Sequence, residues 1–179
     1  MLLRRVSLSA LRLTIAFAIV ATAPLVAHAA AIVPAADPLG AHVRALSPKM
    51  KELVEHGKRR SATFRSLVDT LNRSDVVVYL EITDKLPGGL DGRMMFLTSA
   101  GGVRYLHAQV TKGLGAEELL AVAAHELQHA VEVAAHPEVR DAATLALLYE
   151  RIGMRMTAKD RFDTPAAQLM GRRVRAELS

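Results

Sequence analysis

The segment EELLAVAAHELQHAVEVAA, residues 117–135, is the most strongly patterned stretch of this chain. It opens with two acidic residues, which stabilise the positive end of a helix dipole, and then runs apolar to Ala135. Pro137 disfavours helical backbone at His136, so the segment predicts a helix over about 117–135. His125 and His129 are four residues apart in it and therefore lie on the same face.

Two imidazoles at this spacing can converge on one metal ion, with zinc–nitrogen bonds of about 2.0–2.1 Å. Glu126 follows the first of them and lies about 100° further around the helix. From there its carboxylate can reach past the ion towards a bound water and act as general base. The H-E-x-x-H pattern thus combines a Lewis acid, a polarised water and a base, in the apolar surroundings that a buried metal helix needs.

The sequence AHELQHA, residues 124–130, resembles the active-site helix of the zincin metallopeptidases. The resemblance implies a bound Zn²⁺ ion, with His125 and His129 as ligands and Glu126 as catalytic base. It also implies a fold in which an extended peptide substrate lies along a sheet edge. The chain beyond its N-terminal leader further resembles small exported bacterial proteins that carry this helix.

A catalytic zinc site has three protein ligands, so one carboxylate or imidazole is still needed. In some zincins the third ligand is a Glu on the following helix. In this chain Glu150 occupies the matching position, 21 residues after His129. We therefore expect Glu150 as the third ligand, with Tyr149 either near the site or in the core. Met154 stands where those zincins carry a further acidic residue. The alternative for Glu150 is an exposed helix carboxylate.

Other groups near the motif remain open as ligands. The zincins with a third His further along the same helix have a Gly and a His where this chain has Glu132 and Ala135, so the chain departs from them. Glu132 is better suited to accept a hydrogen bond from an imidazole than to ligate the metal itself. Asp141 and Glu138 are further candidates, and we interpret His136 as a helix-end histidine.

The remaining pattern predicts an α+β domain with an N-terminal helix, a small three-stranded sheet, the motif helix and two further helices. The first helix should begin after Ser47 and run to about Asn72. The other expected elements are strands at 76–82, 93–98 and 103–110, the last two joined as a hairpin, and helices at 137–152 and from Pro165 onwards.

The first 29 residues read as a secretory signal peptide. Arg4, Arg5 and Arg12 precede and flank an uncharged apolar run at 13–26, which is followed by an Ala27-His28-Ala29 cleavage motif. The alternative is an uncleaved membrane anchor, for which the run is short. Residues 30–46 predict a flexible tether and 47–179 a single domain, so we expect a periplasmic or secreted protein.

Charge and cysteine content narrow the function classes. The chain of 179 residues carries a net charge of +5, and because three basic and no acidic residues lie in the leader, the remainder carries only +2. That small excess gives no reason to expect a nucleic-acid partner or a membrane surface. With no cysteine, the fold must form without disulfides.

Two smaller features complete the sequence reading. Arg172, Arg173 and Arg175 in the last helix predict a solvated basic face, and the alternative for them is an anion site. His107 predicts a half-exposed position on the strand before the motif helix. The sequence as a whole predicts a monomeric zinc-dependent hydrolase that cleaves peptide bonds. The alternative is a catalytically inactive envelope binding or scaffold protein with the same fold.

Overall fold

The computed structural model describes residues 40–84, 86–155 and 162–179. These residues form an α+β domain with five α-helices and a four-stranded mixed sheet, which confirms the expected class. The predicted leader, residues 1–29, and the tether as far as residue 39 lie outside the described residues.

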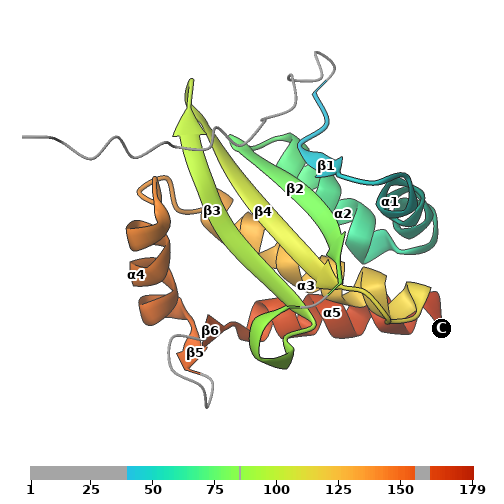
Figure 1. Ribbon diagram of the computed structural model, residues 1–179. Helices are drawn as coiled ribbons and strands as arrows, with labels where there is room; N and C mark the ends of the chain where they lie inside the picture. Colours follow the sequence, from blue (N-terminus) through green and yellow to red (C-terminus); the bar gives the residue numbers. More distant parts are fainter. Residues whose placement is uncertain (1–39, 85, 156–161) are drawn as a thin grey trace, which may run out of the picture. The chain divides into compact units, whose positions relative to one another are not determined.

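The sheet has the spatial order β1-β2-β4-β3 (Figure 1). Strands β1 (Val43–Ala45), β2 (Val76–Thr83) and β4 (Val103–Thr111) run parallel to one another. Strand β3 (Gly92–Ala100) is the antiparallel edge strand. The sequence predicted three strands and missed β1, because its three residues carry no alternating pattern and pair only through the partner strand β2.

The two long strands follow their side-chain pattern. In β2 the first five residues are buried, whereas β4 alternates between buried and half-buried positions. Arg104, Leu106, Ala108 and Val110 of β4 therefore point into the core, and His107 lies half-buried on the opposite face. The predicted β3–β4 hairpin is confirmed, and its turn uses positive φ angles at Gly101 and Gly102.

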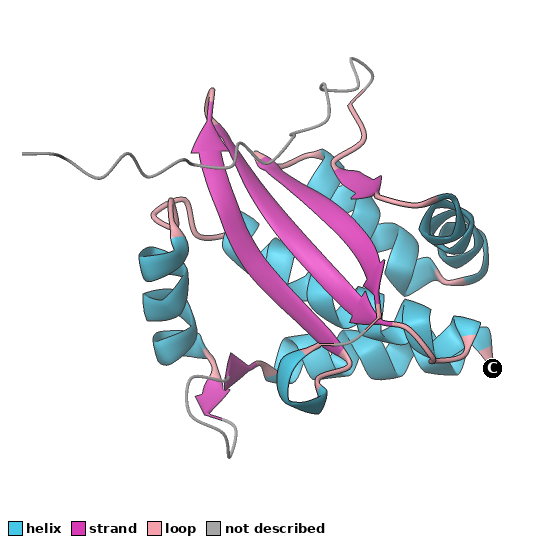
Figure 2. Ribbon diagram, viewed as in Figure 1, coloured by secondary structure: helices cyan, strands magenta, loops and turns pink. Residues whose placement is uncertain are grey.

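Helix α3 (Ala116–Ala134) is the central element of the helical layer. With α2 (Ala62–Asn72) and α5 (Pro165–Leu178) it lies behind the sheet in Figure 2, while α4 (Ala142–Ile152) lies beside β3. Apolar side chains of α3, α2 and the sheet share one core. None of the described helices combines the length and apolar character that crossing a membrane would require.

The single helix expected from residue 48 to 72 is in fact two, α1 (Pro48–Arg60) and α2. The backbone at Ser61 is extended, with φ −121° and ψ 118°, and its hydroxyl accepts a hydrogen bond from the backbone N–H of Phe64. Phe64 packs against Gly57, where a Cβ would meet its ring. Periodicity alone could not separate two helices that share one apolar face.

The helix expected over 137–152 begins only at Ala142. Asp141 caps it through a reciprocal pair of hydrogen bonds with Thr144, which fixes the start at the cap rather than at Pro137. After α4 the chain forms two short paired strands that the sequence did not predict, β5 (Met154–Arg155) and β6 (Phe162–Asp163). They lead into α5, which Thr164 caps as expected.

A buried guanidinium holds the C-terminal end of α3. Arg104 of β4 is fully buried and donates hydrogen bonds of 2.7 and 2.8 Å to the carbonyl oxygens of Val133 and His136. Its Nε donates to Asp75 Oδ2 at 3.0 Å. The guanidinium therefore adds a charged donor to carbonyl groups at the negative end of the helix, and it fixes α3 against the sheet.

Candidate metal centre and active site

Two histidines and one aspartate meet at the inner face of α3. The Nε2 atoms of His125 and His129 are 3.2 Å apart. Asp163 Oδ1 lies 3.2 Å from the first and 3.7 Å from the second. Of the His, Cys, Asp and Glu side chains that the structure describes, these form the one group of three or more close enough to hold a metal ion.

The spacing of these atoms fits a zinc ion. Ligands about 2.0–2.1 Å from a tetrahedral centre are separated from one another by about 3.3–3.4 Å. The three distances, 3.2, 3.2 and 3.7 Å, are close to the edges of one face of such a tetrahedron. Two imidazoles and a carboxylate are also the donor set of hydrolytic zinc sites, with the fourth position left for a water or substrate.

His129 is fixed in one tautomer. Its Nδ1 lies 2.9 Å from Glu132 Oε2, and because that carboxylate accepts another hydrogen bond on its second oxygen, Nδ1 carries the proton. The lone pair of Nε2 is then free to point at the shared centre. The ring also packs edge-on against Tyr149, whose hydroxyl donates to the His129 carbonyl oxygen at 3.2 Å. Glu132 thus has the role expected from its position.

The charges around the two imidazoles differ in effect. Burial lowers the pKa of His125, and the nearby His129 lowers it further. Burial also opposes protonation of His129, but the hydrogen bond that His129 donates to Glu132 and the surrounding carboxylates outweigh it, so the pKa of His129 is raised. Burial raises the pKa of Glu132, but the hydrogen bonds that it accepts from His129 and Thr164 lower this pKa by more. The net effect is a lowered pKa, so the carboxyl group stays ionised.

The start of α5 positions the third candidate ligand, Asp163, which lies two residues before the helix. The Thr164 hydroxyl caps α5 by accepting from the Ala167 N–H, and it donates to Glu132 Oε1 at 2.6 Å. This contact ties the start of α5 to the bonds that orient His129. Asp163, one residue earlier, is held by Gln168, whose Nε2 donates to Asp163 Oδ2 at 3.0 Å. Its other oxygen, Oδ1, faces the imidazoles.

Glu126 follows His125 on α3 and is largely buried. It is 5% exposed, and burial raises the pKa of its carboxyl to about 7. Such a group can take up and release a proton near neutral pH. Strand β3 begins directly against it, because a Cβ at Gly92 would collide with Oε1 of Glu126 and with the Val122 side chain. Glycine at 92 therefore allows the edge strand to approach the carboxylate.

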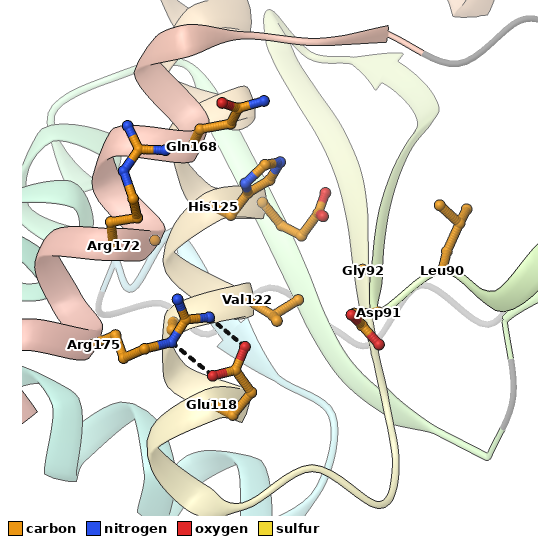
Figure 3. Close-up of a pocket in the computed structure, with 12 residues that line it drawn as sticks. Leu90, Asp91, Gly92, Glu118, Val122, His125, Gln168, Arg172 and Arg175 are labelled. Atoms are coloured by element: carbon orange, nitrogen blue, oxygen red, sulfur yellow. Dashed lines mark hydrogen bonds and ion pairs between the residues drawn. The ribbon is translucent and has the colours of Figure 1, made fainter. Parts of the chain in front are cut away.

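A cavity of about 340 Å³ opens next to this group. His125 and Glu126 line it from α3, Asp91 and Gly92 from the start of β3, and residues of α5 from the other side (Figure 3). Its volume is within the range of small-ligand pockets. The reactive groups therefore face a space that a substrate can enter.

The structure does not bring Glu150 to the two imidazoles. Glu150 is exposed on α4, because its neighbour Tyr149 is the residue turned towards His129 and the next side chain points about 100° away. The described residues that meet the imidazoles include Asp163 in its place. The sequence reading named the Thr164 cap but missed Asp163. An acidic residue immediately before a helix cap was the signal available.

The other candidates have separate roles. Asp141 caps α4, and Glu138 pairs with His136 and with Arg151 at the surface. His107 is half-buried on the far face of the sheet, with Nε2 2.9 Å from Glu81 Oε2 but outside hydrogen-bond geometry. None of these residues lines the cavity beside Glu126.

Searches of this chain against protein-family models, against curated proteins and against solved structures found no match. The function proposed below therefore rests on the geometry of the site.

Proposed function

We propose that this protein is a zinc-dependent hydrolase of the zincin type that cleaves peptide bonds. The observation that carries the proposal is the convergence of His125 Nε2, His129 Nε2 and Asp163 Oδ1 at distances suited to one tetrahedral ion. Asp163 supplies the carboxylate that the sequence motif alone lacked.

We further propose that residues 1–29 direct the chain to the periplasm or beyond.

The chain's own residues would divide the work as follows. His125, His129 and Asp163 hold the ion, and Glu132 and Gln168 orient two of these three ligands. Bound there, zinc would act as a Lewis acid that polarises a carbonyl group and lowers the pKa of a water. Glu126 takes the proton from the attacking water and passes it to the leaving amine.

Two features favour turnover over the alternative, a binding or scaffold protein that lacks activity. A third ligand is available, and Glu126 faces a cavity rather than a closed core. The edge strand β3 begins at that cavity, where an extended peptide could pair with it. A site kept for structure alone would not need an ionisable group beside open space.

The first test is the metal content of the purified protein after exhaustive dialysis, with His125→Ala in parallel. We expect about one zinc per chain, lost in the variant. No zinc in either protein, even after zinc is added back, would overturn the proposal.

The second test separates binding from turnover on a library of fluorescence-quenched peptides. Glu126→Gln should keep its zinc and lose cleavage by a factor of about 10² to 10⁴. Glu117→Gln, an exposed carboxylate on the same helix, should leave both unchanged. Full cleavage by Glu126→Gln would exclude the assigned mechanism.

A further inference from the structure

The basic cluster of α5 does not form one uniform face. Arg172 and Arg175 line the cavity next to His125 and Glu126, together with Gln168 one turn earlier. Arg173, which lies between them in sequence, does not line it. This division follows from helical spacing, since residues three and four apart share a face. All three arginines are exposed, as the sequence predicted, and two of them also line the cavity.

The two arginines of the cavity differ in their partners. Arg175 forms a two-pronged ion pair with Glu118, with its Nε donating to Oε2 at 2.7 Å (Figure 3). Its charge is thus matched within the protein. Arg172, by contrast, makes no ion pair and no side-chain hydrogen bond with any residue that the structure describes. Its guanidinium presents a full set of donors at the cavity.

The three acidic residues of the lining leave Arg172 available. Glu118 is held by Arg175, and Asp91 belongs to the opposite wall, where the chain enters β3 (Figure 3). Glu126 is largely buried and forms no ion pair with Arg172. A planar guanidinium with free donors binds a carboxylate through two parallel hydrogen bonds, a geometry that Lys cannot reproduce.

The position of Arg172 relates the cavity to the reacting atoms. Gln168, which holds Asp163, lies four residues before Arg172 on α5, or about 6 Å along the helix axis. Arg172 therefore lies one helical turn from the residue that orients Asp163, in the lining of the same cavity.

We propose that this cavity binds a carboxylate of the substrate, held by Arg172 beside the metal centre. The inference rests on the proposed peptidase function, and it specifies the class of substrate. The carboxylate can be the C-terminus of a peptide or the side chain of an Asp or Glu residue. Both sources present the same chemistry to the guanidinium.

The experiment uses peptide mixtures of randomised sequence in matched versions. One pair differs only in a free or amidated C-terminus, and the other only in an internal Glu or Gln. Retention on immobilised protein is quantified by mass spectrometry, once after chelation and once after zinc is added. Cleavage by the same protein in solution is followed separately. We expect the carboxylate version of at least one pair to be retained about tenfold better.

The matched variants are Arg172→Ala and Arg173→Ala, both exposed positions on the same helix. Arg172→Ala should reduce the preference to less than about twofold, and Arg173→Ala should keep it. The pair that shows the preference identifies the source of the carboxylate. Equal retention of both versions in each pair, or equal loss of preference in the two variants, would overturn the inference.

Cleavage distinguishes this inference from the function on which it rests. If peptides are cleaved without any carboxylate preference, the inference fails and the peptidase proposal stands. If carboxylate peptides are retained through Arg172 but none is cleaved, the peptidase proposal fails and carboxylate binding is supported.

Discussion

The two ends of α3 are built differently. At the C-terminal end, His129 is fixed by Glu132, Thr164 and Tyr149, and Arg104 holds the last carbonyl groups. At the N-terminal end, the helix faces a cavity, and its main polar contact is the half-exposed pair of Glu118 with Arg175. One helix thus carries a rigid, fully bonded half and an open half.

The two halves of α3 therefore suit different tasks, metal binding at the C-terminal half and ligand binding in the cavity at the N-terminal half. Ligand atoms must be held to within a few tenths of an ångström, so the C-terminal half uses buried hydrogen bonds that permit a single arrangement. Under the proposed function, substrate recognition needs hydrogen-bond donors that are not already paired. Arg172 of α5, which lines the cavity beside the open half of α3, has no ion-pair partner among the described residues. The experiments below test the contrast, beginning with the largest expected effect.

Removing a metal ligand should disrupt the rigid half most strongly. We expect Asp163→Ala to lower zinc affinity by about a thousandfold or more, because one of three ligands is lost. Glu150→Ala should have no effect, since its side chain lies exposed on α4. Competition with a chromophoric chelator measures both. The reverse result would restore Glu150 as the third ligand.

Removing the buried guanidinium tests how firmly α3 is held. Arg104→Met should lower the free energy of unfolding by about 3 kcal/mol, because Asp75 and two helix-end carbonyl groups lose their donor. Arg140→Met is the control, because Arg140 pairs with the same Asp75 carboxylate but is exposed, and its contact is longer, at 3.8 Å. It should cost less than about 0.5 kcal/mol in urea unfolding. Equal losses would show that the buried contacts are not special.

Loss of the group that orients His129 should weaken the site without abolishing it. Glu132→Ala is expected to lower zinc affinity by about 10- to 100-fold. Glu138→Ala removes a carboxylate that also contacts a histidine, His136, but at the surface, and should leave affinity unchanged. An unchanged affinity in Glu132→Ala would mean that His129 is positioned without it.

The smallest effect concerns pH. The hydrogen bond from Arg104 lowers the pKa of Asp75, so this carboxylate stabilises the fold above its ordinary pKa and the contribution is lost as pH falls through the lowered value. Asp75→Asn should therefore be less stable than the unmodified protein at pH 7, by about 1 kcal/mol because the side chain is 37% exposed. The difference should shrink below about pH 4. A constant difference from pH 7 to pH 3 would contradict this account.

The parts of the fold that depend on local sequence pattern were predicted correctly. The motif helix, strand β2 and the β3–β4 hairpin were predicted within a few residues, because their periodicity and turn chemistry are local. The break at Ser61 and the strand β1 were missed. Both depend on partners distant in sequence, Glu177 for the first and β2 for the second.

The candidate site divides in the same way. The positions of His125, Glu126 and His129 follow from spacing on one helix. Asp163 reaches them only because α5 packs on α3, where Gly171 leaves room beside the Ala121 carbonyl and His125. No local pattern encodes that approach. The split between Arg172 and Arg173 likewise needed the packed arrangement to become visible.

The proposed ligands come from two distant parts of a chain that contains no cysteine, the middle of α3 and the residue before the cap of α5. An ion held by His129 and Asp163 would cross-link these two parts and stabilise the folded state, because only there do the ligand atoms converge. Free zinc at a hundred times its dissociation constant would raise the free energy of unfolding by about 2.7 kcal/mol. For this protein a chelator would then act as a reductant acts on a disulfide-bonded one, by removing a cross-link between α3 and the start of α5.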